Sequence, residues 1–414
     1  MTDTLTALGA SVASTLPELI EIRRDLHSHP ELARCETRTT DIIARRLEQA
    51  GVRVRRLTGT GLLADLGAEQ AAYRVALRAD MDALPVQEQT GLAFTSTTDG
   101  VAHSCGHDVH VTALLGAMLA LKEHEHVLLE RGTGVRAIFQ AAEEVIPGGA
   151  HEAIADGAME GVDAIFAIHC DPSLDVGQVG LREGPITAAC DHIRVHLTGR
   201  GGHTSRPQLT EDLTYALAKV VTDVPAALSR RLDPRAGAAL VWGVVQAGTA
   251  SNVIPSTGEC SGTLRMLDAN VWLTIGPVLD EIVQGVVAPY GVTARLERIK
   301  GVPPVVNQAD AIDALRFACL GAGLHMAPTV QSLGGEDYSW YLSHAPGAMA
   351  RLGTRTPGGR TYDLHQGDVV IDEDAIGCGA RLLASVVVAH TVKAGGDTFA
   401  GDHVEIDAKT GSYE

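Results

Sequence analysis

The order in which predicted strands and helices follow one another constrains the fold of this chain most strongly. Within residues 186–300, the pattern of apolar residues predicts a β-α-β-β-α-β order over 192–198, 210–228, 238–247, 258–266, 270–288 and 292–299. This order is typical of a small ferredoxin-like sandwich. Breaks at Gly184-Pro185 and Gly301-Val-Pro-Pro304 flank the segment and indicate a separate unit.

The sequence on either side of this segment has a different character. Helices are predicted over 12–27, 36–50, 109–121, 308–322 and 374–393, and strands over 52–57, 62–66, 73–79, 134–140 and 162–169. Because these strands are apolar, we expect helices on both faces of their sheet. The predicted fold is a three-layer α/β/α domain formed by residues 1–185 and 301–414, into which residues 186–300 are inserted.

Bulk properties narrow the class of protein. The chain has 414 residues, too many for one typical core, which agrees with two domains. Its net charge of −18 argues against nucleic acid or an anionic membrane surface as a partner. The 7 cysteines are scattered and odd in number, which favours a reducing compartment. We see neither a signal peptide nor the ~20 uninterrupted apolar residues of a membrane span, and we predict a cytoplasmic enzyme.

Side chains that can bind metal are concentrated in two short motifs, His103-Ser-Cys-Gly-His-Asp108 and Gln140-Ala-Ala-Glu-Glu144. Cys105 and His107 are two residues apart, which places both side chains on one face of an extended segment. A thiolate, an imidazole and a carboxylate are the ligands that a zinc-like ion prefers. The two glutamates follow a predicted strand, where sites form in α/β sheets. One carboxylate that binds metal and one that moves protons would suffice for metal-assisted hydrolysis.

Further candidates also lie at the ends of predicted strands. Asp80 and Asp82 point to the same side by their spacing. They are either solvated acids of an ordinary turn or groups that orient a ligand imidazole through hydrogen bonds. His169 is a third candidate ligand, although a lone histidine after an apolar strand is more often structural. His365 carries little weight by itself.

The inserted segment contributes polar residues of its own. His203 lies in the glycine-rich stretch 199–207, where it is either an incidental turn residue or a functional one. Asn252 and Arg265 belong to the same segment. An arginine at the end of a strand usually faces solvent, but it can also clamp a substrate carboxylate in two-point geometry.

Two competing chemistries receive less support. Cys105 could be a thiol nucleophile paired with His107, but this leaves the glutamate pair unexplained. Residues 59–64 fit the dinucleotide-binding pattern G-x-G-x-x-A, yet they lead into a predicted strand rather than a helix. The sequence contains no G-x-S-x-G nucleophile elbow.

A set of motifs in a fixed order carries a resemblance to a known family: Asp25-Leu-His-Ser-His-Pro-Glu31, Arg78-Ala-Asp-Met-Asp-Ala-Leu-Pro85, His103-Ser-Cys-Gly-His-Asp108, Gln140-Ala-Ala-Glu-Glu144, Gly201-Gly-His203, Asn252-Val-Ile-Pro255 and Gly335-Glu-Asp337. Over about residues 15–390, the chain resembles the M20 metallopeptidase family. Within it, the chain is most similar to the branch of N-acyl-amino-acid, hippurate and indole-acetyl-amino-acid hydrolases. Two positions depart from the family pattern: Ala141 replaces a frequent proline, and His365-Gln-Gly replaces His-x-Pro.

The resemblance implies two divalent metal ions held by Cys105, His107, Glu144, His169 and His365. It implies that Glu143 is the general acid/base. In a dimer, His203 would reach the neighbouring subunit's site and polarise the carbonyl. Asn252 and Arg265 would contact substrate, with the arginine holding the α-carboxylate. Zinc is the expected ion because of the thiolate ligand, with manganese or cobalt as alternatives.

The expected reaction is hydrolysis of an N-acyl amino acid to a carboxylic acid and a free amino acid by a metal-activated water. The inserted segment would then act as a lid and as the dimerisation domain of a homodimer. A metallo-dipeptidase or carboxypeptidase with the same centre is the alternative. A binding protein without activity is a third hypothesis, and the presence of Glu143 argues against it.

Overall fold

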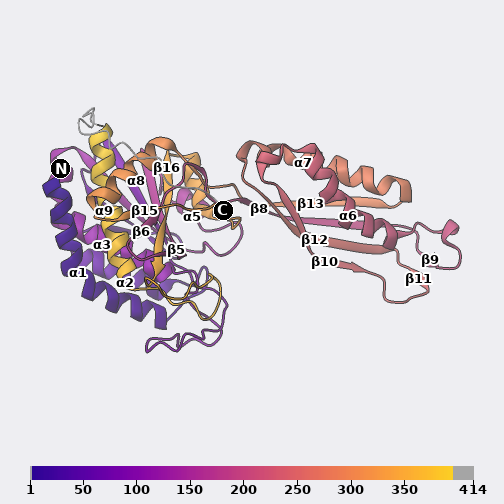
Figure 1. Ribbon diagram of the computed structural model, residues 1–414, viewed down its shortest axis with the longest axis horizontal. Helices are drawn as coiled ribbons and strands as arrows, with labels where there is room; N and C mark the ends of the chain where they lie inside the picture. Colours follow the sequence, from indigo (N-terminus) through magenta and orange to yellow (C-terminus); the bar gives the residue numbers. More distant parts are fainter. Residues whose placement is uncertain (1, 395–414) are drawn as a thin grey trace, which may run out of the picture.

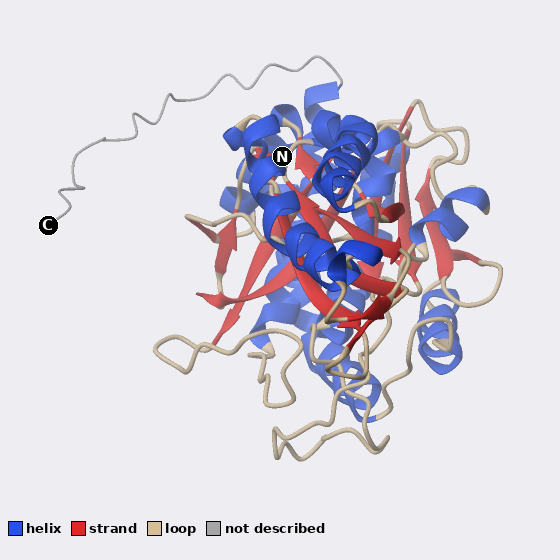
Figure 2. Cartoon of the chain, turned by 90° about the vertical axis from the view of Figure 1, so that its right-hand side faces the viewer, coloured by secondary structure: helices blue, strands red, loops and turns tan. Residues whose placement is uncertain are grey.

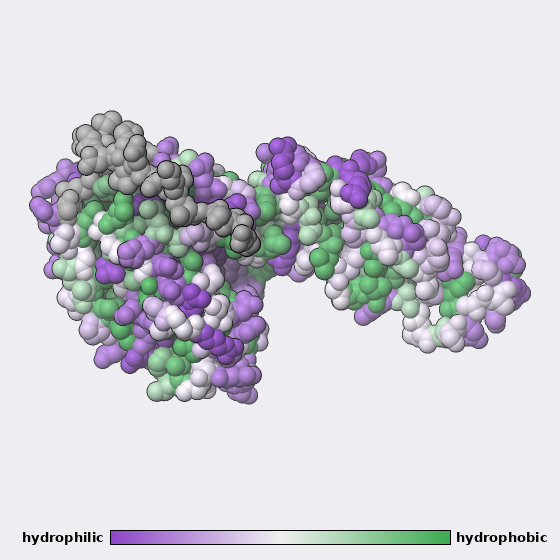
Figure 3. Space-filling model, viewed as in Figure 1, coloured by the Kyte–Doolittle hydropathy of each residue, from purple (hydrophilic) through white to green (hydrophobic). Residues whose placement is uncertain are grey.

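The computed structural model describes residues 2–394 and divides them into two lobes (Figure 1). The large lobe contains both ends of the described chain, and the small lobe contains the middle third. Residues 395–414 of the predicted first domain lie outside the described residues. Figure 3 shows that only a narrow connection joins the two lobes.

The large lobe is built on a mixed sheet of eight strands. Their order across the sheet is β1 (Arg53–Arg56), β2 (Leu62–Gly67), β4 (Thr133–Gln140), β3 (Tyr73–Asp80), β5 (Ala164–Asp175), β16 (Gly347–Arg355), β6 (Gln178–Gly180) and β15 (His325–Ala327). The four central strands β4, β3, β5 and β16 are parallel. Their carboxyl ends therefore meet at one edge, where the predicted site residues follow them.

Helices cover the two faces of this sheet unequally. One face packs against the long helices α1 (Thr2–Ser28), α2 (Thr37–Gln49), α3 (His107–Glu123), α8 (Ala309–Gly321) and α9 (Asp374–Ala394). The other face packs against the short helix α5 (Ala150–Ala155) and the 3-10 helix η4 (Asp337–Ser343). The expected three-layer α/β/α architecture is confirmed, with one thin helical layer; Figure 2 shows the helices around the strands.

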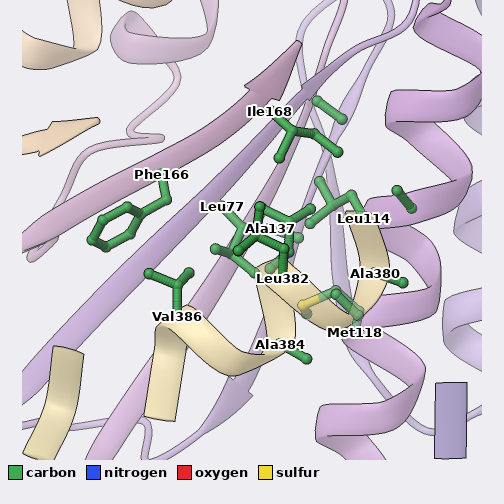
Figure 4. Packing of buried hydrophobic residues seen from close by; sticks show 14 of the residues in the cluster. Leu77, Leu114, Met118, Ala137, Phe166, Ile168, Ala380, Leu382, Ala384 and Val386 are labelled. Carbon is green, nitrogen blue, oxygen red and sulfur yellow. The ribbon is translucent and has the colours of Figure 1, made fainter. Parts of the chain in front are cut away.

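Side-chain alternation along the strands accounts for these two cores. Leu77 and Phe166 point to the thick helical layer, whereas their neighbours Ala76 and Ala167 belong to the core beneath α5. Figure 4 shows Leu77 and Phe166 packed together with Leu114 of α3 and other apolar side chains. The strands are apolar on both faces because both faces are covered.

The small lobe has the predicted ferredoxin-like order. Its elements are β8 (Ala189–Thr198), α6 (Leu213–Arg231), β10 (Ala239–Ala247), β12 (Thr257–Met266), α7 (Ala269–Val287) and β13 (Thr293–Val302). Its sheet is antiparallel in the order β10-β12-β8-β13. Asp212 and Asp268 cap the two helices: Asp212 accepts a hydrogen bond from the N–H of Tyr215, and Asp268 accepts from those of Asn270 and Val271.

Two short strand pairs complete the chain path. β9 (Gly202–His203) pairs with β11 (Val253–Ile254) at the tip of the small lobe. β7 (Gly184–Pro185) pairs with β14 (Val306–Asn307), so the chain leaves and re-enters the large lobe at one place. That residues 186–300 form a separate domain stays a prediction. The remaining short helices are α4 (Glu125–Glu130), η1 (Pro207–Leu209), η2 (Pro234–Ala236) and η3 (Ala288–Tyr290).

The predicted helices and strands are all present, and most ends differ by a few residues. α1 begins at Thr2, well before the predicted start at residue 12. The central strand β16 was not predicted at all. Its sequence is rich in glycine and alanine, which have weak strand propensity, and its place in the sheet comes from pairing with β5.

Two described stretches have the length and composition of a membrane-crossing helix: Asp3–Ser28 and Ala269–Tyr290. Both also contribute to the cores of the lobes. Leu8 and Leu19 are buried in the large lobe, and Leu279 and Val283 in the small one. Their length and composition are therefore only weak evidence for a membrane span.

Candidate metal centre

A cavity of about 390 Å³ lies at the carboxyl ends of the central strands, next to the base of the small lobe. Its lining contains residues predicted for the site: Cys105, Glu143, Glu144, His169, Arg265 and His365. A larger depression of about 700 Å³ lies over strands β8, β10 and β12 of the small lobe. It contains none of the predicted site residues, so the first cavity is the candidate site.

Backbone carbonyls orient two of the predicted ligand imidazoles. His107 Nδ1 lies 2.8 Å from the carbonyl oxygen of Asp82, and His169 Nδ1 lies 2.8 Å from that of Cys170. A carbonyl can only accept, so each Nδ1 donates its proton there, and Nε2 is the ring nitrogen left to face a metal. Burial, together with Arg351 and His110, holds the pKa of His169 well below its usual range, which keeps this ring neutral.

Two groups of potential ligands meet at Cys105. One group is Cys105, His107 and His169; the other is Cys105, Glu144 and His365. Within each group, the ligand atoms lie within 4.8 Å of one another. Thiolate, imidazole and carboxylate are the donors that zinc-like ions prefer, and two groups that share one sulfur fit a pair of ions.

Unpartnered atoms also fit a cation at this place. Glu144 Oε1 lies 3.3 Å from His365 Nε2 and 3.7 Å from His107 Nε2. Among the residues that the structure describes, neither Glu144 Oε1 nor His107 Nε2 has a hydrogen bond, although both are buried. Such atoms are costly unless a partner satisfies them, and a metal ion would do so. The neighbouring Cys105 and Glu144 raise the pKa of His365 to about 10.

Two buried carboxylates hold the loop that carries the glutamate pair. The Asp82 carboxylate accepts hydrogen bonds from the N–H groups of Glu143 (3.0 Å) and Glu144 (2.9 Å). Glu36 accepts one from the N–H of Ala142 (2.8 Å), whose φ of 57° is strained for a residue with a side chain. The turn thereby aims both glutamates into the cavity.

The Asp80 carboxylate contacts His110 and Arg78. Its Oδ1 lies 2.5 Å from Nδ1 of His110, and its Oδ2 lies 2.6 Å from Arg78. His110 also accepts a hydrogen bond from the N–H of Cys170 (2.8 Å), so both of its ring nitrogens are used. Asp80 is still close to the predicted ligands, with Oδ2 3.7 Å from His107 Nε2.

Glu143 faces a group of acids that we did not predict. Burial and the charges of Glu336, Glu144 and Asp337 raise the pKa of Glu143 well above its usual value. A carboxyl group with a raised pKa is better suited to accept a proton and to donate it again. The motif Gly335-Glu-Asp337 belongs to the sequence resemblance, and its two acids lie beside Glu143 in the cavity wall.

A buried arginine links this acidic group to Asp80. Arg78 lies 3.1 Å from Glu336 and 2.7 Å from Asp337 as well as beside Asp80. Burial opposes its charge, yet the three carboxylates keep the pKa of Arg78 well above its usual value. The permanent charge of Arg78 therefore holds these three carboxylates in place at the back of the cavity.

The predicted residues of the small lobe lie in two different places. Arg265 lines the cavity, and its guanidinium donates a hydrogen bond to the carbonyl of Leu333. His203 and Asn252 are exposed and belong to the paired segments around β9 and β11, at the end of the small lobe away from the large one (Figure 1). Within one subunit, the structure does not bring these two residues to the cavity.

Known hydrolases resemble this chain over most of its length. The sequence model of "Peptidase family M20/M25/M40" matches residues 76–389. The chain is 36% identical to the N-acetyl-L-cysteine deacetylase of Bacillus subtilis over 87% of its own length and 85% of that protein. It is 35% identical to thermostable carboxypeptidase 1 of Saccharolobus solfataricus, over 91% of this chain and 96% of that protein.

One relative is much longer than this chain. The "Putative glutamate--cysteine ligase 2-3" of Rhodococcus jostii is 46% identical over 89% of this chain. The chain spans only 46% of that protein's length, so the activity in its name is not carried over.

A solved structure supports both the fold and the metal centre. The YXEP protein of Bacillus subtilis, described as a dinuclear metal-binding peptidase from the M20 family, matches with a TM-score of 0.79 and 32% identity. The match covers 91% of this chain and 98% of that protein. The chain belongs to the amide-hydrolysing peptidase family M20/M25/M40.

Proposed function

We propose that this enzyme is a metal-dependent amidohydrolase that cleaves N-acyl amino acids into a carboxylic acid and a free amino acid. The observation that carries the proposal is the pair of ligand groups meeting at Cys105, with Glu143 beside them. The similarity to an N-acetyl-L-cysteine deacetylase favours an acylated amino acid as the substrate.

The proposed metal ligands are Cys105, His107, Glu144, His169 and His365. Two divalent ions bound there would acidify water and polarise the amide carbonyl. Glu143 takes a proton from the attacking water and transfers it to the leaving amine. Arg265 holds the α-carboxylate of the substrate, and its place in the cavity wall supports this role.

We propose zinc as the bound ion, because a thiolate and three imidazoles favour zinc over harder cations. Manganese and cobalt are the alternatives. Elemental analysis of protein purified without added metal would distinguish the three; magnesium or calcium in its place would contradict the ligand assignment.

We further propose a homodimer formed through the small lobe. β10 is an edge strand of that sheet, and it exposes Val241, Val244 and Val245. An edge with exposed apolar residues invites pairing with a second strand. In such a dimer, His203 and Asn252 would belong to the partner subunit's site, which accounts for their distance from the cavity of their own chain.

A cytoplasmic location is also part of the proposal. All 7 cysteines are free, and all except Cys35 are buried. The predicted ligand Cys105 must remain reduced to bind metal, which a reducing compartment favours.

The test begins with removal of metal by a chelator, which should abolish hydrolysis of N-acetyl-L-methionine, and its readdition, which should restore it. In Glu143→Gln, kcat should fall about 10²–10⁴-fold while the metal content is unchanged, because the substitution removes the proton acceptor alone. Glu152→Gln is the matched control, since Glu152 is an exposed glutamate paired with Arg34. Hydrolysis that persists without metal, or in Glu143→Gln, would contradict the mechanism.

The alternative is a metallo-dipeptidase or carboxypeptidase with the same centre, and the carboxypeptidase relative favours it. The two functions differ in the acyl side of the substrate. Faster cleavage of L-alanyl-L-methionine than of N-acetyl-L-methionine would select the peptidase; the reverse would select the amidohydrolase.

A further inference from the structure

A second arginine lines the cavity, and neither the metal centre nor the proposed mechanism uses it. Arg351 lies on the central strand β16, opposite His169 on β5. Its neighbours Ala350 and Leu352 point into the core beneath the long helices, and Met349 points to the other face. By alternation, Arg351 lies on the same face as Met349, the face on which the cavity opens.

The guanidinium of Arg351 is buried but has no partner. Its residue is only 7% exposed. Within the described part of the chain, no hydrogen bond or ion pair joins its side chain to another residue, and the carboxylates of Asp171 and Glu336 act on it only through space. None of its nitrogens is among the fully enclosed polar atoms without a partner, so they open to the cavity that Arg351 lines.

Other buried arginines of this protein do have partners. Arg78 pairs with three carboxylates, and Arg298 pairs with Asp191 at 2.6 Å. A buried arginine is costly to leave without an acceptor, and its planar group matches a carboxylate. The acids whose charges act on Arg351 are engaged elsewhere: Asp171 accepts hydrogen bonds from Ser173, and Glu336 pairs with Arg78.

We infer that Arg351 binds a second carboxylate of the substrate, in addition to the α-carboxylate assigned to Arg265. This inference rests on the proposed function and narrows its substrate class to N-acyl amino acids with two negative charges. The second carboxylate belongs either to the side chain of the amino acid or to the acyl group. Both sources supply the same chemistry, and the substrates below separate them.

The experiment compares kcat/KM of the metal-loaded enzyme for three substrates. N-acetyl-L-methionine is the reference with one carboxylate. N-acetyl-L-glutamate adds a carboxylate on the amino-acid side, and N-succinyl-L-methionine adds one on the acyl side. We expect the wild-type enzyme to prefer one of the two dianionic substrates over the reference, and that substrate identifies the source.

Substitution of Arg351 should remove this preference. In Arg351→Met, which keeps an unbranched side chain, the ratio of kcat/KM for the preferred dianion to that for the reference should fall about 10- to 100-fold, mainly through KM. Arg351→Lys should retain part of the preference, because it keeps the charge. Arg355→Met is the matched control on the same strand, since Arg355 pairs with Asp175 at 2.6 Å, and it should leave the ratio unchanged.

Three outcomes would overturn the inference. A wild-type enzyme that cleaves the reference at least as well as both dianions has no second anion site; this measurement needs no variant to fold. An equal loss for all substrates in Arg351→Met would show that Arg351 only balances the charge of the cavity. An enzyme that cleaves none of the three would overturn the proposed function and this inference with it.

Discussion

At the scale of single residues, buried carboxylates do more to build the site than to perform its chemistry. Asp82 accepts hydrogen bonds from the N–H groups of both Glu143 and Glu144. The Asp82 side chain therefore fixes the backbone position of the proposed base, Glu143, and of the proposed ligand, Glu144. The family motif around residues 25–31 is structural in the same way, since Glu31 accepts hydrogen bonds from the first N–H groups of α2, at Arg38 and Thr39.

Asp82→Asn tests this positioning role. An asparagine has only one acceptor oxygen and would turn its NH₂ group toward a backbone donor. We expect metal affinity or kcat to fall about 10- to 100-fold, the usual effect of removing a group that orients metal ligands. Metal titration and steady-state kinetics measure the two. Asp65→Asn is the control, because Asp65 pairs with Arg136 at 2.9 Å away from the cavity; equal losses in both variants would argue against the positioning role.

A second residue-scale prediction concerns pH. Burial alone would lower the pKa of His27, but Asp108 (2.8 Å from Nδ1) and Glu88 (3.2 Å from Nε2) leave it raised above its usual value. A group whose pKa is raised on folding stabilises the protein fully below its unfolded pKa of about 6.5. This contribution is lost as the pH rises through the folded pKa.

His27→Asn should therefore lower the Tm more at pH 6 than at pH 9. At pH 6 the expected loss of stability is about 2 kcal/mol, the size of hydrogen bonds to charged groups. Thermal unfolding of the metal-loaded wild type and variant at both pH values provides the measurement. A deficit of the same size at the two pH values would mean that His27 does not change charge in this range.

At the scale of elements, the thick helical layer depends on close approach of α1, α3 and α9. A Cβ atom added at Gly116 of α3 would lie 2.6 Å from Leu19 Cδ1 and 3.0 Å from Ala380 Cβ. Leu19 is fully buried and Ala380 is held by its own helix, so neither can move away freely. Gly116 therefore sets the spacing between three helices.

Gly116→Ala and Gly285→Ala should have opposite effects on stability. Both positions are helical, and alanine is favoured over glycine in a helix by about 1 kcal/mol. A Cβ atom at Gly285 of α7 meets nothing within 4 Å, so we expect stabilisation of about 0.5–1 kcal/mol. At Gly116, overpacking should outweigh the gain and destabilise the protein by about 1–2 kcal/mol. Urea unfolding measures both; stabilisation by Gly116→Ala would show that the helices separate easily.

What the sequence could predict also differs between elements. The periodic helices and the ferredoxin-like order of the small lobe were predicted because their apolar residues repeat regularly. The sequence does not predict β16, because its glycines and alanines give no clear alternation of apolar and polar residues. For the same reason it does not single out Arg351, which lies on this strand. Only the pairing of β16 with β5 brings Arg351 beside His169, and nothing local in the sequence signals that pairing. Cys105 and His107, in contrast, were visible as neighbours in one dense motif.

At the scale of the whole molecule, the position of His203 far from the cavity of its own chain bears on how subunits assemble. His203 lies with β11 at the tip of the small lobe, and β10 offers an exposed apolar edge on the same lobe. If two subunits pair along β10, each tip belongs to the other subunit's site. The proposed site would then be complete only in the dimer.

Mixing two inactive variants tests this arrangement. His203→Ala and Glu143→Gln should each be nearly inactive as homodimers. After exchange of subunits, a mixed dimer has one site with both Glu143 and His203, so an equal mixture should recover about a quarter of wild-type activity. Val245→Lys at the β10 edge should prevent recovery and give a monomer by light scattering. A mixture that stays inactive, despite proven subunit exchange, would contradict the role of His203 across the interface.

The strand pair β7 and β14 has a consequence for how such enzymes diverge. Because the chain departs and comes back through neighbouring residues, Gly184–Pro185 and Val306–Asn307, whatever lies between them can be lengthened, shortened or exchanged during evolution. All five proposed metal ligands are encoded outside that interval. Selection can thus remodel assembly and the contributions of His203 and Arg265 in one stretch of the gene, while the proposed metal ligands and Glu143 are inherited intact from the rest.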